Sequence, residues 1–338
     1  MNAESVKARL KNVAMETGRT FQDLLGSYGM ERTLYRLSIS DYREKFTLKG
    51  GIFLYALYDG DYPRATTDID LLARGIGNDI DEMKTVFTHI FSITTDDPLK
   101  FDLESLDVKS ITEFKEYHGV NVSITAFMDR TRIPVSIDIG FGDVIYPDRI
   151  LMDFPVLLSE DAPEVYAYSL YSSIAEKFEA MVLLGYDNSR FKDFYDIYVN
   201  AQKYDFDGQI LVEAIKETFD HRGTSLHTIV AFNPEYSDDA IRLSRWKSFV
   251  KKKKVSLDVT LPETIEVIKQ FLLPVTNAIE TGCSSACLTS CCSCSSSACL
   301  LPLPNGTTSI PPRRRRSVTC SPSPFSSSPT SPSRWSRW

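Results

Sequence analysis

The chain has 338 residues, of which 43% are hydrophobic and 25% charged, enough for one large or two modest globular domains with buried cores. Its net charge is −7, and six arginines but no acidic residue follow residue 280, so residues 1–280 carry −13. This acidic body excludes broad electrostatic attraction for nucleic acid, and any such contact needs a local basic patch. The runs Lys251–Lys254 and Arg313–Arg316 are candidates, although most charge runs are solvated faces.

In chain order, helical and strand-like patterns alternate up to about residue 150. Apolar residues at helical spacing predict two helices before residue 38, the second capped by Thr20. The next predicted elements are a strand at 46–48, a Gly-Gly turn, a helix at 52–58, a strand that begins at Asp68, a helix at 79–91, and strands at 120–127 and from 133.

After about residue 165 the periodicity becomes helical. The predicted helices span 168–184, 190–201, 208–218, 238–252 and 263–272. This order is typical of an α/β unit followed by a helical region, with the boundary between residues 150 and 167. We therefore expect a first domain over 1–160, a helical domain over 161–280, and a tail over 281–338.

The tail is rich in Ser, Pro and Cys and has no acidic residue. Such a composition cannot bury enough apolar surface to offset the entropy of ordering, so we predict that it is disordered. All seven cysteines lie in it, and its CCSC stretch lacks the paired C-x-x-C spacing of a zinc module.

No part of the sequence resembles a membrane segment. The first twenty residues have no apolar core of signal-peptide length, and no stretch approaches the roughly 18 apolar residues of a membrane span. We therefore expect the protein in the cytoplasm, without a membrane partner.

The stretch RATTDIDLL places Asp68 and Asp70 two residues apart in an apolar run. Because a strand alternates its faces, Ile69 and Leu71 can enter a core while the two carboxylates share the opposite face, about 6 to 7 Å apart at Cα. Carboxylates held in this way repel each other unless a cation lies between them. For an isolated pair, a solvated edge strand is the simpler alternative.

A second acidic strand residue occurs in IPVSIDIGFGD, where Ser136 and Asp138 alternate with apolar residues. If the two strands are neighbours, Asp138 can converge with Asp68 and Asp70. Three oxygen donors on rigid strands suit Mg²⁺, which completes its coordination with water and substrate phosphates. This arrangement is typical of phosphoryl or nucleotidyl transfer.

Upstream, LKGGIFL places Gly50 and Gly51 between a strand and a helix. Without a Cβ, these residues let the backbone approach a ligand, and the start of the helix presents free N–H groups and the positive end of its dipole to an anion. The turn therefore supplies the phosphate site that the metal site requires.

The helical half adds charged residues at defined positions. Lys177 lies along an apolar stripe with Ile174 and Phe178, so its ammonium must reach outward to water or meet an anion. Arg190 and Asp193 are i,i+3 neighbours. Spacing alone favours an ordinary helix ion-pair network there, worth about a few tenths of a kcal/mol per pair.

Over roughly residues 34–200, the sequence resembles the nucleotidyltransferase toxins of the abortive-infection AbiEii/AbiGii type. The resemblance rests on five stretches in this order: LKGGIFL, R-x-T-T-D-I-D-L, SIDIGFGD, EKFEAM and SRFKDFYDI. The resemblance implies a polymerase-beta-like nucleotidyltransferase fold of the α+β class. It also implies a small mixed sheet that carries the Gly-Gly turn and the acids, with a helical region that closes one wall of the cleft. The Gly-Gly turn suits this toxin group, whereas the wider superfamily favours Gly-Ser.

By this resemblance, Asp68 and Asp70 hold Mg²⁺, with Mn²⁺ as an alternative. Asp138 corresponds to the third metal-binding carboxylate of the superfamily, which helps to deprotonate the attacking hydroxyl. Gly50 and Gly51 bind the triphosphate of an NTP. Asp193 is a required acidic residue. The remaining predicted site residues are basic and contact the nucleotide phosphates or the acceptor: Lys49, Arg64, Lys177, Arg190 and Lys192.

The resemblance therefore implies an Mg²⁺-dependent enzyme that moves a nucleoside monophosphate from an NTP to an acceptor and releases pyrophosphate. The expected acceptor is RNA, such as tRNA, and the expected role is the toxin of a toxin–antitoxin pair with a cognate antitoxin. Transfer to a small molecule such as an antibiotic, and a catalytically silent nucleotide- or partner-binding module, are the alternatives. Glycosyltransferases also use a D-x-D motif to bind metal, but a glycosyltransferase function would not explain the Gly-Gly turn.

Overall fold

A computed structural model gives the fold over residues 2–113, 117–226, 228–255 and 259–281. The α-helices are α1 (Ala3–Thr17), α2 (Phe21–Ser38), α3 (Gly50–Leu57), α4 (Ile80–Ser92), α5 (Leu170–Leu184), α6 (Phe191–Lys203), α7 (Gly208–Arg222), α8 (Pro234–Ser237), α9 (Ala240–Lys252) and α10 (Leu261–Thr281). The strands are β1 (Phe46–Lys49), β2 (Ile69–Ala73), β3 (Lys100–Glu113), β4 (Tyr117–Met128), β5 (Thr131–Phe141), β6 (Ile150–Asp153) and β7 (Glu164–Ala167). Short 3₁₀ turns are η1 (Arg43–Lys45), η2 (Gly185–Asp187) and η3 (Val230–Phe232).

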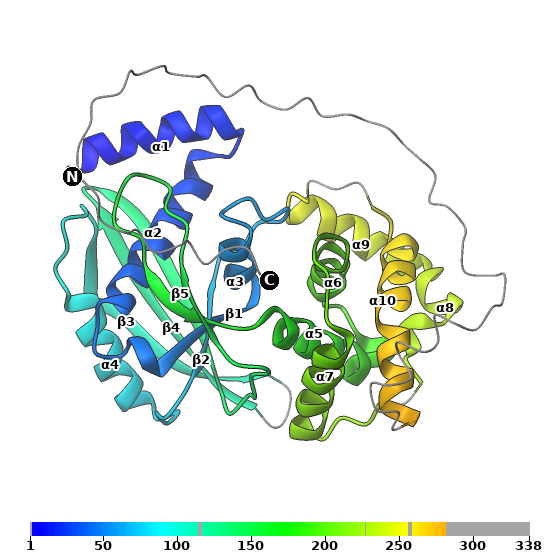
Figure 1. The fold of residues 1–338 in the computed structure, drawn as a ribbon. Coiled ribbons are helices and arrows are strands. Elements are labelled where there is room, and N and C mark those ends of the chain that lie inside the picture. Colours follow the sequence, from blue (N-terminus) through cyan, green and yellow to red (C-terminus); the bar gives the residue numbers. More distant parts are fainter. Residues whose placement is uncertain (1, 114–116, 227, 256–258, 282–338) are drawn as a thin grey trace, which may run out of the picture. The chain divides into compact units, whose positions relative to one another are not determined.

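Within the described ranges, the strands form one seven-stranded sheet in the order β3-β4-β5-β2-β1-β7-β6 (Figure 1). β2 runs parallel to β5 and antiparallel to β1, and β1 runs parallel to β7. This mixed sheet with flanking helices confirms the predicted α+β class. The sheet is larger than the small one that we expected, because β3, β6 and β7 were not predicted.

The core of the α/β part follows from the alternation that the sequence displays. Along β5, Ile133, Val135, Ile137 and Ile139 are buried and the residues between them are more exposed. Helix α2 packs on this strand so closely that a Cβ at Gly29 would lie 2.7 Å from Cγ2 of Ile133. Glycine at this position therefore sets the distance between helix and sheet.

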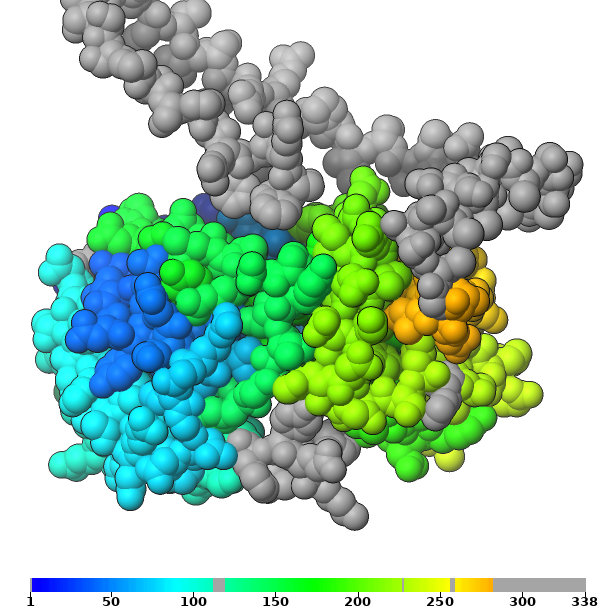
Figure 2. Space-filling model, turned by 60° about the horizontal axis from the view of Figure 1, so that its bottom comes forward, coloured from blue at the N-terminus to red at the C-terminus, as the bar shows by residue number. Residues whose placement is uncertain are grey.

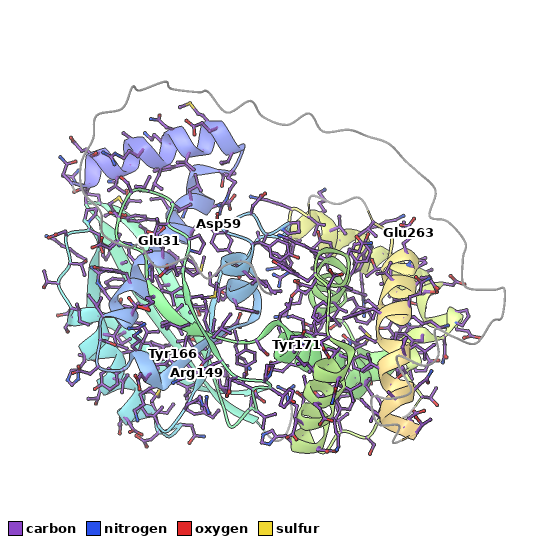
Figure 3. All side chains as sticks on the ribbon, in the orientation of Figure 1. Glu31, Asp59, Arg149, Tyr166, Tyr171 and Glu263 are labelled. Atoms are coloured by element: carbon purple, nitrogen blue, oxygen red, sulfur yellow. The ribbon has the colours of Figure 1, made fainter. Side chains whose placement is uncertain are left out.

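The edge formed by β6 and β7 is fastened by a cation–π contact. The Arg149 guanidinium lies 3.7 Å from the centroid of the Tyr166 ring (Figure 3), and it also donates to the backbone oxygen of Glu44.

β7 lies beyond residue 160 and still pairs with β1 in the sheet. The division of the chain at residues 160 and 280 remains a prediction.

The helical region predicted after residue 165 is confirmed in order, with shifted ends. Helix α5 packs against α6 and α7, and α10 packs against the same two helices. Figure 2 shows this region, coloured green to orange, beside the blue-to-green α/β part. Helix α10 continues through Pro274 to Thr281, whereas we ended the last helix at residue 272.

Two further predictions concern the ends of the fold and membranes. The predicted disordered tail lies outside the described residues, apart from Thr281 at the end of α10. Among the described helices, none has the length and apolar composition needed to cross a membrane.

Candidate active site

A cavity of about 960 Å³ lies between the sheet and the helical region. Its walls come from the start of α3, from β2 and β5, and from α5, α6 and α7. Ten of the eleven predicted site residues line it: Lys49, Gly50, Gly51, Arg64, Asp70, Asp138, Lys177, Arg190, Lys192 and Asp193. The eleventh, Asp68, is not part of the lining.

Asp70 and Asp138 are brought together by strand register. β2 and β5 pair in parallel with Asp70 opposite Asp138, and on the other side of β2, Lys49 of β1 lies opposite Asp70. Asn121 on β4 donates from Nδ2 to Oδ1 of Asp138 at 2.6 Å and to the Ser136 hydroxyl at 2.9 Å. The amide therefore fixes the orientation of one carboxylate next to the other.

No described side chain forms a hydrogen bond or ion pair with the Asp70 carboxylate. Burial raises the pKa of Asp70 above its ordinary value, although the charges of Lys192 and Lys49 act in the opposite direction. The nearby Asp138 charge adds to the increase. Two adjacent carboxylates without a bonded cation fit a divalent metal ion by charge and by donor type.

The described residues contain no cluster of three or more His, Cys, Asp or Glu arranged to hold a metal. A metal ion at Asp70 and Asp138 would therefore complete its coordination with water and substrate oxygens, as Mg²⁺ commonly does.

Asp68 lies outside the cavity for a local reason. The pairing between β2 and β5 begins at Ile69, so the alternation of a strand does not extend to the residue before it. Asp68 is exposed, and its Oδ2 accepts a hydrogen bond from the Thr67 hydroxyl at 3.0 Å. The expected convergence of three carboxylates is therefore found for two of them, and a metal-binding role for Asp68 remains a prediction.

The Gly-Gly turn forms the junction between β1 and α3. Gly50 has a φ of +65°, and a Cβ on it would lie 2.1 Å from Oδ2 of Asp70. Only glycine allows the backbone and this carboxylate to approach so closely. No side chain caps α3, whose N-cap residue is Lys49, so its first N–H groups remain available to an anion.

Arg64 and Lys177 share one buried carboxylate behind the turn. Arg64 donates to both oxygens of Asp196, at 2.6 and 2.7 Å, and the Tyr62 hydroxyl donates to Oδ1 at 2.8 Å. Lys177 Nζ lies 2.9 Å from Oδ2 of Asp196. Although burial opposes ionisation of Asp196, these two cations hold its pKa well below the ordinary value. Lys177 therefore meets an anion, which was one of the two predicted outcomes.

Asp193 forms ion pairs with Arg190 and Lys177. Its Oδ2 accepts from Arg190 Nε at 2.6 Å, and Oδ1 lies 3.6 Å from Lys177 Nζ. The carboxylate is fully buried, and Oδ1 accepts no hydrogen bond from the described residues. The predicted helix ion pair is thus present, but it lies buried in the cavity wall and not on a solvated face.

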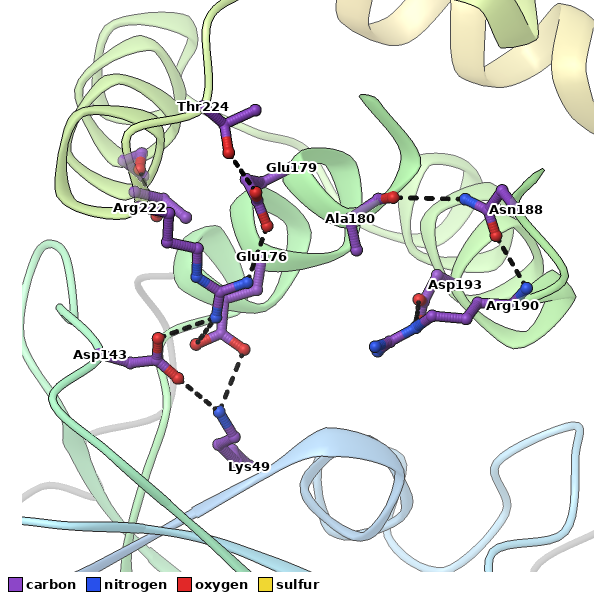
Figure 4. Close-up of polar contacts among 12 residues, drawn as sticks. Lys49, Asp143, Glu176, Glu179, Ala180, Asn188, Arg190, Asp193, Arg222 and Thr224 are labelled. Carbon is purple, nitrogen blue, oxygen red and sulfur yellow. Dashed lines mark hydrogen bonds and ion pairs between the residues drawn. The ribbon is translucent and has the colours of Figure 1, made fainter. Parts of the chain in front are cut away.

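At the other end of the cavity, Lys49 belongs to an ion-pair network (Figure 4). Its Nζ lies 2.8 Å from Asp143 Oδ2 and 3.3 Å from Glu176 Oε2. Arg222, at the end of α7, bonds Asp143 at 2.8 Å and Glu179 at 2.8 Å. Although burial acts against ionisation, Lys49 and Arg222 lower the pKa of Asp143 to about 2. This network joins the sheet to the helical region.

The sequence-based prediction missed several residues of these networks: Asp143, Glu176, Glu179, Asp196 and Arg222. All but Arg222 lie inside the quoted stretches SIDIGFGD, EKFEAM and SRFKDFYDI, which were a usable signal. Arg222 lies in no such stretch, and only the packing of α7 against α5 brings it to the site.

The sequence matches the model of the family described as "Nucleotidyl transferase AbiEii toxin, Type IV TA system" over residues 32–264, which is more than half of the chain. The chain belongs to this family. Membership confirms the predicted family and enzyme class, a nucleotidyltransferase, in the context of a type IV toxin–antitoxin system.

Comparison with other known proteins adds two similar structures. No protein with a curated description matches the sequence. A crystal structure of a candidate nucleotidyltransferase from H. pylori is 14% identical, with a TM-score of 0.48, over 78% of this chain and 99% of that one. The structure of JHP933 from Helicobacter pylori is 14% identical, with a TM-score of 0.46, over 80% and 98%.

Proposed function

We propose that this AbiEii-family enzyme transfers a nucleoside monophosphate from an NTP to RNA, such as tRNA, in a reaction that depends on Mg²⁺. An acceptor hydroxyl oxygen forms a bond to the α-phosphorus, the bond from that phosphorus to the bridging oxygen breaks, and pyrophosphate leaves. The proposal is carried by one observation, the pairing of Asp70 with Asp138 next to the uncapped start of α3.

Asp70 and Asp138 are the residues that would hold the metal ion. When bound, Mg²⁺ neutralises phosphate charge and lowers the pKa of a coordinated hydroxyl. Asn121 holds one oxygen of Asp138, and the other is free of described partners, so it can accept the proton of the acceptor hydroxyl.

The triphosphate would lie against the start of α3. The N–H groups at the start of α3 have no side-chain cap and can bind an anion, and Lys192, which lines the cavity without a described ion pair, supplies a positive charge. Lys49 and Lys177 already have carboxylate partners, so they would share their donors between these partners and the phosphates.

In the cell the reaction would disable RNA, and a cognate antitoxin would counter the effect. The family description supports the toxin role, whereas RNA as acceptor extends the proposal beyond it.

The test is transfer of label from each of the four α-³²P-labelled NTPs to total RNA, to a tRNA fraction and to small-molecule acceptors, with Mg²⁺, Mn²⁺ or EDTA. We expect labelled RNA with metal and none with EDTA. Asp70→Asn should reduce the rate more than about 100-fold, as for a group that acts in the transition state. The exposed Asp129→Asn is the matched control. Label in small molecules alone, or full activity of Asp70→Asn, would contradict the proposal.

A further inference from the structure

The end of α9 concentrates positive charge on a body that is otherwise acidic. Lys251 and Lys252 are exposed in the last turn of α9, and Lys253 follows as the C-cap residue. Among the described residues, none forms an ion pair with these three lysines, whereas Lys254 is paired with Asp23 at 2.5 Å. Since residues 1–280 carry a charge of −13, this group stands out as a local basic patch.

The patch is linked through Lys253 to a chain segment that lines the active-site cavity. The carbonyl oxygen of Lys253 accepts a hydrogen bond from the N–H of Ala65 at 3.1 Å, and the preceding residue, Arg64, lines the cavity. Burial and the charges of Arg64 and Lys192 lower the pKa of Lys253, although Asp68 acts in the opposite direction. Lys253 is therefore near Lys192, which is exposed and belongs to the cavity lining.

Together, Lys192, Lys253, Lys252 and Lys251 form a path from the cavity to the outer surface, which we call the lysine track. We propose that the lysine track binds the phosphodiester backbone of a single-stranded RNA acceptor and leads its end into the cavity. This inference rests on the proposed function, whose acceptor it locates.

A chain of phosphates fits the track better than the NTP does. Lys251 and Lys252 do not belong to the cavity lining, so a triphosphate bound at the start of α3 is not their partner. A backbone with one charge per nucleotide can bridge the distance from them to Lys192. The lysine track attracts the negatively charged RNA backbone, whereas the rest of the acidic body repels it.

The contact should depend little on base sequence. The two aromatic residues of α9 are not available for stacking on a base. Trp246 is buried and donates from Nε1 to the carbonyl oxygen of Val259 at 2.9 Å, and the ring of Phe249 packs against Trp246 and Tyr195. Lysines that contact phosphates position a nucleic acid without reading its sequence.

The test compares the full-length protein with two variants. One carries Lys251→Glu and Lys252→Glu, and the control carries Lys84→Glu and Lys216→Glu, which are exposed on α4 and α7 outside the cavity lining. Fluorescence anisotropy measures the binding of a labelled single-stranded RNA over a series of salt concentrations, and calorimetry measures NTP binding.

We expect the track variant to bind RNA at least about tenfold more weakly, with a log–log salt slope reduced by about 1.4, or 0.7 per lost phosphate contact. Its NTP affinity and the RNA affinity of the control variant should stay within about twofold of the parent protein. Equal RNA binding by both variants, or no RNA binding by the parent at low salt, would overturn the inference.

The outcomes separate this inference from the proposed function. If RNA binds through the track but receives no label, the track is an RNA-binding site and the proposed function, with RNA as the acceptor, is wrong. If RNA is labelled with the same KM in parent and track variant, the proposed function stands and the track is wrong.

Discussion

Replacing Asp196 by Asn should reveal how much of the fold depends on one carboxylate. Asp196 is fully buried and neutralises two cations, Arg64 and Lys177, whose side chains are only 4% and 10% exposed. The amide keeps the shape but leaves Arg64 without its bonded counter-charge, and it leaves Lys177 with only the longer, 3.6 Å contact to Asp193. Breaking a buried pair by removing one partner costs about 3–5 kcal/mol, and Arg64 cannot escape the cost by losing its proton.

The measurement is thermal and urea unfolding followed by circular dichroism at pH 7. For a protein of this size, about 3–5 kcal/mol corresponds to a decrease in Tm on the order of 6–20 °C. Asp129→Asn, which breaks the more exposed pair with Lys7 at 3.1 Å, is the control and should change stability by less than about 1 kcal/mol.

A third variant identifies the cause. Lys177→Met leaves Arg64 and Asp196 as a balanced pair. Combined with Asp196→Asn, it leaves Arg64 as the one unpaired cation and removes the weakly paired Lys177 charge. The double variant should therefore be less destabilised than the sum of the single changes, by about 1–3 kcal/mol. If Asp196→Asn costs less than about 1 kcal/mol, or if the two changes add exactly as independent sites do, the reasoning about the shared carboxylate is refuted.

Three further outcomes are expected. Burial raises the pKa of Glu31, whose side chain is labelled in Figure 3, to about 7. The free energy of unfolding should therefore fall by up to about 3 kcal/mol as pH rises from about 4.5 to 7. Glu31→Gln should abolish this slope in a pH series of thermal unfolding. The pKa of Asp143 is lowered to about 2, so its contribution of roughly 2 kcal/mol should vanish as pH falls from about 4 to 2, and Asp143→Asn should flatten that acid limb. Gly50→Ala should abolish transfer, measured with labelled NTP, because the added Cβ would collide with the carboxylate of Asp70. At Gly26 in α2 an added Cβ meets nothing within 4 Å, so Gly26→Ala should raise Tm slightly.

Local patterns in the sequence were enough to predict the core of the site. Alternation in two strands places Asp70 and Asp138 on the polar side, and the parallel register of β2 and β5 then sets them opposite each other. A lysine in an apolar helical stripe must find an anion or reach water, and Lys177 finds Asp196. The strand face of each aspartate and the need of Lys177 for an anion or water require only the residue types and the period of one element, whereas the neighbourhood of β2 and β5 was a condition of the prediction.

Features that depend on distant packing could not be predicted in the same way. β3 was missed because its register shifts between Asp102 and Asp107, which interrupts the alternation that marks a strand. β6 and β7 have four residues each, too few for a clear period. The last predicted helix ended at residue 272, whereas α10 continues through Pro274 to Thr281.

The charges of the cavity suggest a division of labour between its inside and its rim. Inside, Lys49, Arg64 and Lys177 are held by carboxylates, which orients them but cancels most of their long-range field. A polyanionic acceptor therefore gains little attraction from the interior, and the acidic body repels it further. The exposed cations Lys251 and Lys252 lie outside the cavity lining and can act over a distance, so in the proposed reaction they would capture the acceptor while residues inside the cavity would position the reacting phosphate.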